Sequence, residues 1–150
     1  MRIFISNRYD LSMKEKQNPA FFDDDKFFIT IRNSDDADWA IQHNVDRYVL
    51  RLTFDDILSE EADGKLFNAK QARKIKSFVD NLNPKKLLFI NCETGISRSI
   101  AIGEVINEYL NNFLVNNQED YAYFLNNNDT QLSNQHVKSM LLKEFFGENI

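Results

Sequence analysis

The segment 87–114 most constrains what this chain can fold into, because it joins an apolar run to a polar turn and then to a helical pattern. Leu87 to Ile90 is wholly apolar, as is typical of a strand that is covered on both faces. After the turn from Asn91 to Ser97, the apolar residues recur at helical spacing as far as about Leu114. A strand that feeds a helix through a tight turn is typical of α/β domains, whose ligands bind beyond the carboxyl ends of the strands.

Three further runs rich in β-branched and aromatic residues have the composition of strands, and three more segments have helical spacing or a capping residue. The strands are expected at 2–6, 27–31 and 48–54, and the helices at 69–82, around 121–125 and after Ser133 as the cap. This alternation predicts a single α/β domain over residues 1–150. Its central sheet is expected to be mainly parallel, with about four to five strands flanked by helices.

The net charge of −5 bears on which partners the surface can bind. Acidic runs at 23–25, 35–38 and 60–61 repel nucleic acid and anionic membranes, which bind through clustered Lys and Arg. One basic cluster falls on a predicted helix and is expected to be a solvated face. It consists of Lys70, Arg73, Lys74 and Lys76. We therefore expect neither nucleic acid nor a membrane as a partner.

Cys92 is the one cysteine of the chain, which excludes an intramolecular disulfide and a zinc site built from several cysteines. A lone thiol that must stay free favours a reducing compartment. Because the first residues also lack the apolar stretch of a signal peptide, and no segment approaches the length of a membrane span, we expect a cytoplasmic protein. His43 and His136 lack metal-ligand spacing, so we expect no metal and no other cofactor.

The turn after the apolar strand has the composition of an anion cradle. Cys92 ends the strand and Arg98 opens the helix, with five residues between them. A tight loop that runs into a helix N-terminus points several backbone N–H groups at one spot, and the helix dipole adds positive potential. Gly95 permits the tight backbone, and Arg98 can grip two phosphoryl oxygens at once. The expected phosphate-binding residues are Glu93, Thr94, Gly95, Ile96, Ser97 and Arg98.

The same electrostatic field favours the thiolate of Cys92 and makes it a candidate nucleophile. The hydroxyl of Ser99 can hydrogen-bond the Cys92 sulfur and stabilise it as a leaving group. Taken singly, a cysteine at a strand end is more often a small apolar residue, and a helical arginine such as Arg98 is more often a surface residue. The order of strand, glycine, hydroxyls and helix favours the catalytic interpretation.

Cys-x5-Arg with Gly and Ser-Arg-Ser inside it resembles the phosphate loop of protein tyrosine phosphatases, especially the compact dual-specificity branch of bacterial and phage type. The resemblance covers roughly residues 27–112 and extends more weakly to Asn134–Lys138. It implies a cysteine-dependent phosphomonoester hydrolase that forms a phosphocysteine intermediate. The implied substrates are phosphoproteins or phosphopeptides carrying phosphotyrosine, phosphoserine or phosphothreonine.

The family supplies its general acid, an aspartate, on a loop that follows a strand upstream of the cysteine. Thr53-Phe54-Asp55-Asp56-Ile57 stands at that position, and the resemblance aligns Asp56 with the acid while Asp55 is the alternative. From the residues alone, an Asp-Asp pair is also common where a surface loop opens or a turn is capped.

Asn91 departs from the family pattern, and Glu93 narrows the range of expected substrates. Asn91 stands where the family usually has a histidine that lowers the thiol pKa, so Cys92 is expected to be less acidic, with weaker activity or activity at higher pH. Glu93 places a carboxylate inside the loop, which disfavours phosphoinositides and polynucleotide ends. Two alternatives stay open: a phosphate-binding module with little turnover, and a phosphatase of a small phosphorylated metabolite or nucleotide.

Overall fold

The predicted strands pair into one sheet in which all neighbouring strands run parallel. The structure, a computed structural model, describes residues 1–22, 25–42 and 48–147, so the acidic positions 23–24 and His43 lie outside the described residues. The strands are β1 (Ile3–Asn7), β2 (Lys26–Arg32), β3 (Val49–Thr53) and β4 (Leu87–Cys92), in the spatial order β1-β4-β2-β3. The predicted fold class, a parallel sheet flanked by helices, is confirmed.

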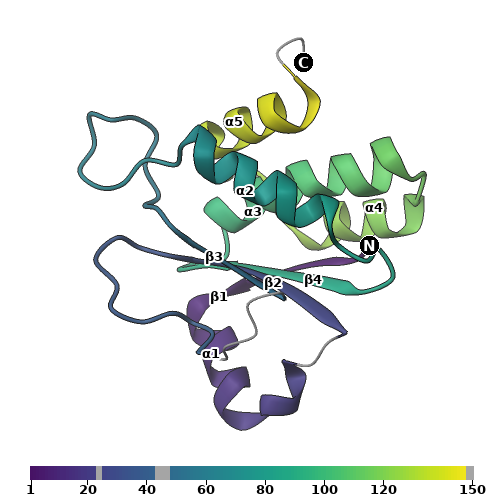
Figure 1. Ribbon diagram of the computed structural model, residues 1–150, viewed down its shortest axis with the longest axis horizontal. Helices are drawn as coiled ribbons and strands as arrows, with labels where there is room; N and C mark the ends of the chain where they lie inside the picture. The colour runs from purple at the N-terminus through teal and green to yellow at the C-terminus, as the bar shows by residue number, and fades with distance from the viewer. Residues whose placement is uncertain (23–24, 43–47, 148–150) are drawn as a thin grey trace.

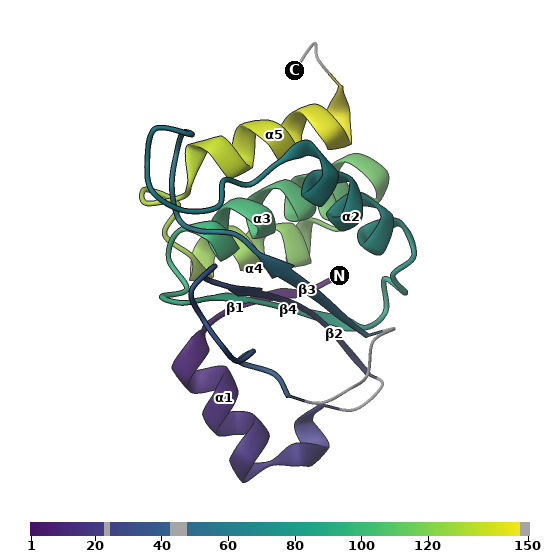
Figure 2. The ribbon, with the colours of Figure 1, turned by 60° about the vertical axis from the view of Figure 1, so that its left-hand side comes forward.

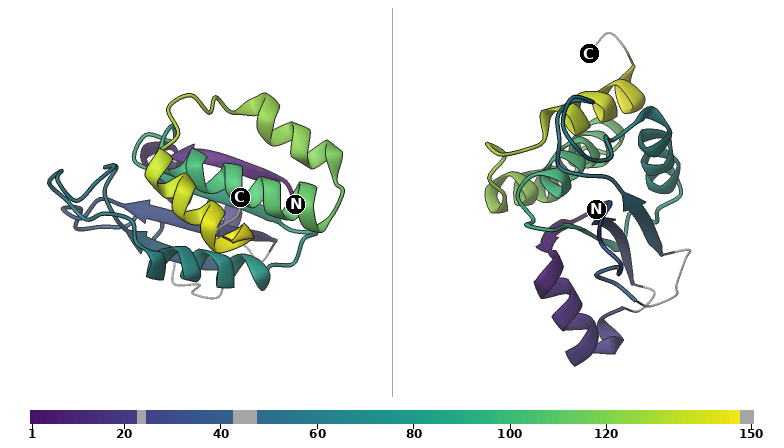
Figure 3. Two further views of the ribbon diagram at one scale, coloured as in Figure 1. Left: turned by 90° about the horizontal axis from the view of Figure 1, so that it is seen from above. Right: turned by 90° about the vertical axis from the view of Figure 1, so that its left-hand side faces the viewer.

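Helices cover both faces of this sheet, as Figure 1 and Figure 2 show. One face carries α1 (Arg8–Gln17) and the short 3-10 helix η1 (Pro19–Phe21). The opposite face carries α2 (Ala69–Asp80), α3 (Arg98–Asn107), its π-helical continuation η2 (Glu108–Leu114), α4 (Gln118–Asn127) and α5 (Gln135–Phe146). Figure 3 shows α5 lying over α2 and α3, and it packs against both.

The two faces explain why the central strands are so apolar. Ile29 of β2 and Ile90 of β4 point into a large cluster beneath α2, α3 and α5, and Leu141 of α5 belongs to the same cluster. Phe28 points the other way, into a smaller cluster that Leu11 of α1 completes. Because side chains alternate between two buried layers, a strand in the middle of the sheet is apolar at nearly every position.

Asparagine side chains cap α1, α2, α4 and α5, at Asn7, Asn68, Asn117 and Asn134. Asn68 forms a capping box with Gln71, each side chain accepting a hydrogen bond from the other residue's backbone N–H. The predicted cap at Ser133 is wrong, because the side chain of Asn134 accepts the hydrogen bond from the Val137 N–H at 3.0 Å. The helix therefore begins one residue later than expected, and the Ser133 hydroxyl is buried without a partner among the described residues.

The basic cluster lies on α2 as expected, with Lys70, Arg73 and Lys74 exposed and Lys76 paired to Asp80 at 2.7 Å. None of the helices in the described part of the chain has the length and apolar character that spanning a membrane requires.

Candidate active site

The loop 93–97 joins β4 to α3 at the carboxyl edge of the sheet, with Cys92 as the last residue of the strand and Arg98 as the first of the helix. The backbone of β1 and its following helix hold the loop in place, since the Arg8 N–H donates to the Glu93 carbonyl at 3.2 Å. Gly95 has φ +73°, and a Cβ there would lie 3.0 Å from both the carbonyl carbon and oxygen of Ser6. Glycine fits this position for two reasons, its backbone conformation and its close approach to β1.

The thiol of Cys92 is buried beneath this loop among hydrogen-bond donors. Its Sγ lies 3.1 Å from the Ser99 Oγ, and the Gly95 N–H donates to it at 3.3 Å. Burial acts to raise the pKa of the thiol, but the Ser99 and Gly95 hydrogen bonds and the Arg98 charge together hold it below its ordinary value. The arrangement therefore favours the thiolate, the nucleophilic form of a cysteine.

Arg98 is 3% exposed, and only part of its hydrogen-bonding capacity is used. Its Nη1 donates to the Phe54 carbonyl at 2.7 Å, which ties the loop after β3 to the start of α3. Its Nε is buried without a hydrogen-bond partner among the described residues. A buried cationic donor left unpaired is costly, and the edge formed by Nε and Nη2 has the fork geometry that binds two oxygens of a phosphate or carboxylate.

The start of α3 also leaves its backbone donors available. Ser97 is the N-cap of this helix, but its side chain makes no capping hydrogen bond. Its hydroxyl donates to Asp56 Oδ1 instead, at 2.8 Å. The first N–H groups of the helix are therefore not satisfied by their own cap, and such groups bind anions readily. The side chains of Glu93, Thr94 and Ile96 are exposed, so these residues offer the cradle their backbone.

The two adjacent aspartates point in different directions. Asp55 accepts hydrogen bonds from the Ser34 N–H at 2.9 Å, the Ser34 hydroxyl at 2.5 Å and the Lys65 N–H at 2.6 Å. Burial acts to raise the pKa of Asp55, but these hydrogen bonds outweigh it and hold the pKa below its usual value. Asp56 instead reaches the phosphate loop through Ser97. Of the two aspartates, Asp56 is therefore the one that contacts the loop 93–97.

Asn134 is a site residue whose role the sequence analysis missed. Its Nδ2 donates to Asp56 Oδ1 at 2.8 Å, although the two residues are 78 positions apart in sequence. An Asn directly before a helical apolar pattern predicts an N-cap. That local signal does not indicate that the same side chain also contacts Asp56, on a loop distant in sequence.

Asn91 does not contact the thiol. It is buried with its Nδ2 3.4 Å from the Cys92 carbonyl oxygen, and its Oδ1 has no partner among the described residues. Thr30, its register neighbour on β2, also has a buried hydroxyl without a described partner. The Asn91 side chain therefore adds neither charge nor a hydrogen bond to the Cys92 sulfur.

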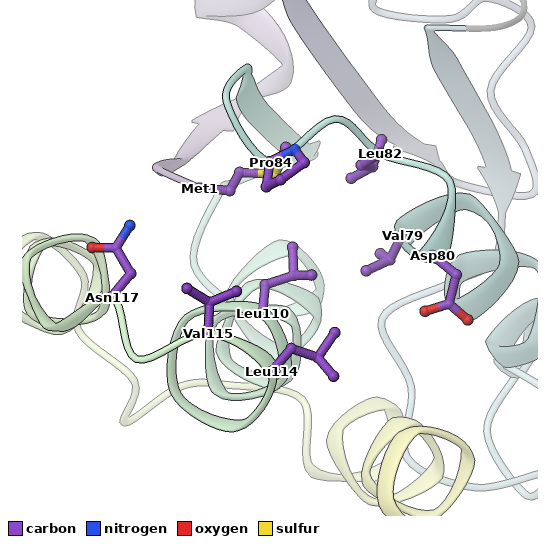
Figure 4. A pocket seen from close by; sticks show the side chains of 9 residues that line it. All are labelled: Met1, Val79, Asp80, Leu82, Pro84, Leu110, Leu114, Val115 and Asn117. Atoms are coloured by element: carbon purple, nitrogen blue, oxygen red, sulfur yellow. The ribbon is translucent and has the colours of Figure 1, made fainter.

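Within residues 1–22, 25–42 and 48–147, no group of three or more His, Cys, Asp and Glu side chains is placed to hold a metal ion. His136 instead has its Nε2 2.8 Å from the Phe67 carbonyl oxygen. A separate pocket of about 290 Å³ lies beside Met1 and Pro84 (Figure 4). These residues precede β1 and β4, so the pocket lies at the edge of the sheet opposite the loop 93–97. Its lining is mainly apolar, which suits an anion poorly.

Comparison with solved structures adds a structural likeness. No protein-family model matches the chain, and no curated protein matches its sequence. The crystal structure of PTPMT1 is similar, with a TM-score of 0.48 and 11% sequence identity, over 96% of this chain and 88% of that one. The functional assignment therefore rests on the site itself.

Proposed function

We propose that this protein is a cysteine-dependent phosphomonoester hydrolase acting through a phosphocysteine intermediate. The observation that carries the proposal is the junction of β4 and α3, where a thiol of lowered pKa lies beside a buried arginine with an unpaired donor edge. Helix N–H groups, Arg98 and a thiolate suit in-line attack on a bound phosphoryl group.

In the first half of the reaction, a lone pair of the Cys92 Sγ forms a bond to phosphorus as the ester P–O bond breaks. The electrons of that bond go to the leaving oxygen, which takes a proton from Asp56. The phosphoryl oxygens are held by Arg98 and by the backbone N–H groups of residues 93–98, which stabilise charge as it develops.

In the second half, water attacks the phosphorus of the phosphocysteine and Asp56, now a carboxylate, takes its proton. The P–S bond breaks, and the sulfur leaves as a thiolate. The hydroxyl of Ser99 and the N–H of Gly95 lie 3.1 Å and 3.3 Å from this sulfur, so both can stabilise the departing negative charge.

We propose phosphoproteins or phosphopeptides as the substrates, attacked at phosphotyrosine, phosphoserine or phosphothreonine. The exposed carboxylate of Glu93 within the loop disfavours substrates with further phosphates nearby, including phosphoinositides and nucleic-acid ends. A phosphate-binding module with little turnover is the second candidate. The burial of the Cys92 thiol and the uncharged Asn91 behind it favour this alternative.

Turnover of p-nitrophenyl phosphate without metal separates the two candidates. We expect wild-type activity that Cys92→Ser abolishes and that Asp56→Ala lowers by about 10²–10⁴-fold, the usual contribution of a general acid. Asp55→Ala is the matched control, expected to lower stability rather than the chemical step. A wild type no faster than Cys92→Ser at any pH from about 5 to about 9 would leave only the binding module. A crippled Asp55→Ala beside a normal Asp56→Ala would reverse the acid assignment.

A further inference from the structure

Asn134 joins three segments that carry the proposed chemistry. It is 3% exposed at the N-cap of α5, where its Oδ1 accepts from the Val137 N–H at 3.0 Å. Its Nδ2 donates to Asp56 Oδ1 at 2.8 Å and to the Ile57 carbonyl at 3.1 Å. Its backbone N–H donates to the carbonyl of Ser97 at 3.3 Å. One buried residue therefore connects three segments: its side chain joins α5 to the loop of Asp56, and its backbone N–H joins α5 to the loop 93–97.

The two hydrogen bonds on Asp56 both reach the same oxygen. The Ser97 hydroxyl and the Asn134 amide each lie 2.8 Å from Oδ1, and Oδ2 has no hydrogen-bond partner among the described residues. An amide nitrogen can only donate, so Oδ1 must act as an acceptor whether Asp56 is ionised or neutral. In the neutral acid this favours the proton on Oδ2, because the carbonyl oxygen is the better acceptor of the two donated hydrogen bonds. The carboxyl group is also held against Ser97, next to Arg98.

Resting on the proposed function, we infer that Asn134 is the positioning residue for the general acid, fixing Oδ1 of Asp56 so that Oδ2 presents the proton to the leaving oxygen. The two ends of its amide have separate tasks. The oxygen caps α5 and stabilises the fold, while the nitrogen orients the acid. This division makes the inference testable, because a substitution can keep one end and remove the other.

Asn134→Asp keeps an acceptor for the Val137 N–H, and Asp is as good an N-cap as Asn. It replaces the Nδ2 donor by a carboxylate oxygen that repels Asp56, whereas Asn134→Ser removes the donor without adding charge. The readout is kcat/KM for two aryl phosphates that differ in leaving group. Phenolate needs protonation far more than p-nitrophenolate does, so loss of acid positioning slows phenyl phosphate more. We expect kcat/KM for phenyl phosphate to fall about tenfold or more relative to p-nitrophenyl phosphate, part of the usual contribution of a general acid.

Two comparisons separate positioning from a structural role. Ser133→Ala changes the neighbouring buried side chain, whose hydroxyl has no described partner, and we expect it to leave the ratio of the two rates unchanged. In an Asp56→Ala background, Asn134→Asp should no longer change that ratio, because residues that act through one another are not additive. If Asn134→Asp does not fold, Asn134→Ser keeps a favourable N-cap and carries the same expectation.

The possible results separate the positioning role of Asn134 from the proposed phosphatase activity. A folded Asn134 variant with the wild-type ratio, or one whose ratio changes equally without Asp56, overturns the positioning role while Cys92-dependent turnover stands. Turnover by wild type that does not depend on Cys92 overturns both. A changed ratio that disappears in the Asp56→Ala background establishes the role.

Discussion

Replacing Gly95 with alanine tests whether the phosphate loop packs directly on the backbone of β1. The residue has φ +73°, and the left-handed conformation costs an L-residue about 1–2 kcal/mol. The new Cβ would also lie 3.0 Å from the Ser6 carbonyl carbon and oxygen and 3.2 Å from the Asn7 nitrogen. These are backbone atoms that cannot rotate away, and overpacking of this kind costs about 1–3 kcal/mol. We expect Gly95→Ala to lower the free energy of unfolding by about 2–5 kcal/mol.

Gly147→Ala is the matched control for this substitution. Gly147 has φ +89°, and nothing lies within 4 Å of the Cβ it would gain, so this variant carries the conformational cost without the steric one. Gly147 has ψ −177°, a backbone conformation almost confined to glycine, so we expect Gly147→Ala to lose about 1–3 kcal/mol, and urea denaturation of both variants measures the difference. Turnover of p-nitrophenyl phosphate should fall sharply in Gly95→Ala, because the loop must move away from β1 and so displaces the Gly95 N–H that donates to the Cys92 sulfur. It should be unchanged in Gly147→Ala.

Equal losses of stability in the two variants would refute the close approach of the loop to β1. A Gly95→Ala protein that is destabilised as expected but keeps full turnover would refute a different step. It would show that the backbone position of residue 95 is not needed for the chemistry.

Three further substitutions test separate features. In Ser99→Ala the thiol loses a hydrogen bond that lowers the pKa of Cys92, so that pKa rises. The acid limb of the pH profile of kcat/KM follows formation of the thiolate, and we expect it to move to higher pH. An acid limb at the wild-type pH would contradict this prediction. Arg98→Lys removes the bidentate fork, and kcat/KM measured with p-nitrophenyl phosphate should fall about 10²–10³-fold, whereas a loss below about tenfold argues against a two-oxygen grip. Thr30→Val replaces a buried hydroxyl that has no described partner by a methyl group of the same shape. Urea denaturation should show a free energy of unfolding that is unchanged or higher by about 1 kcal/mol. A clearly lower free energy of unfolding would reveal a hydrogen bond of the Thr30 hydroxyl.

The sheet could be predicted because its strands are covered on both faces. β2 and β4 lie between two buried layers, so composition alone marks them as strands. The helix α1 was missed for the opposite reason. Leu11 is its one buried residue, so its sequence shows little of the apolar periodicity that indicates a helix. What the sequence does carry is an Asn7 cap that accepts from the Asp10 N–H at 2.7 Å.

The loop 93–97 could be predicted in position because it is local. Cys92, Gly95, Arg98 and Ser99 lie within one strand–turn–helix unit, and their order fixes which groups converge. Which aspartate contacts this loop could not be decided in the same way. Asp55 and Asp56 are neighbours of the same type, and what separates them is tertiary: the partners of Asp55 come from two other loops.

Asn134 illustrates the limit of local reasoning and also suggests how the site is stabilised. The carboxylate of Asp56 is exposed on a loop, yet it is fixed by a side chain that is itself buried at the start of α5. That helix is anchored in the core by Val137 and Leu141, so its packing energy also restrains the acid loop. The orientation of Asp56 therefore depends on burial of apolar residues far from the reacting atoms. A substitution that weakens the packing of Val137 or Leu141 should therefore lower kcat/KM even in a protein whose sheet is still folded.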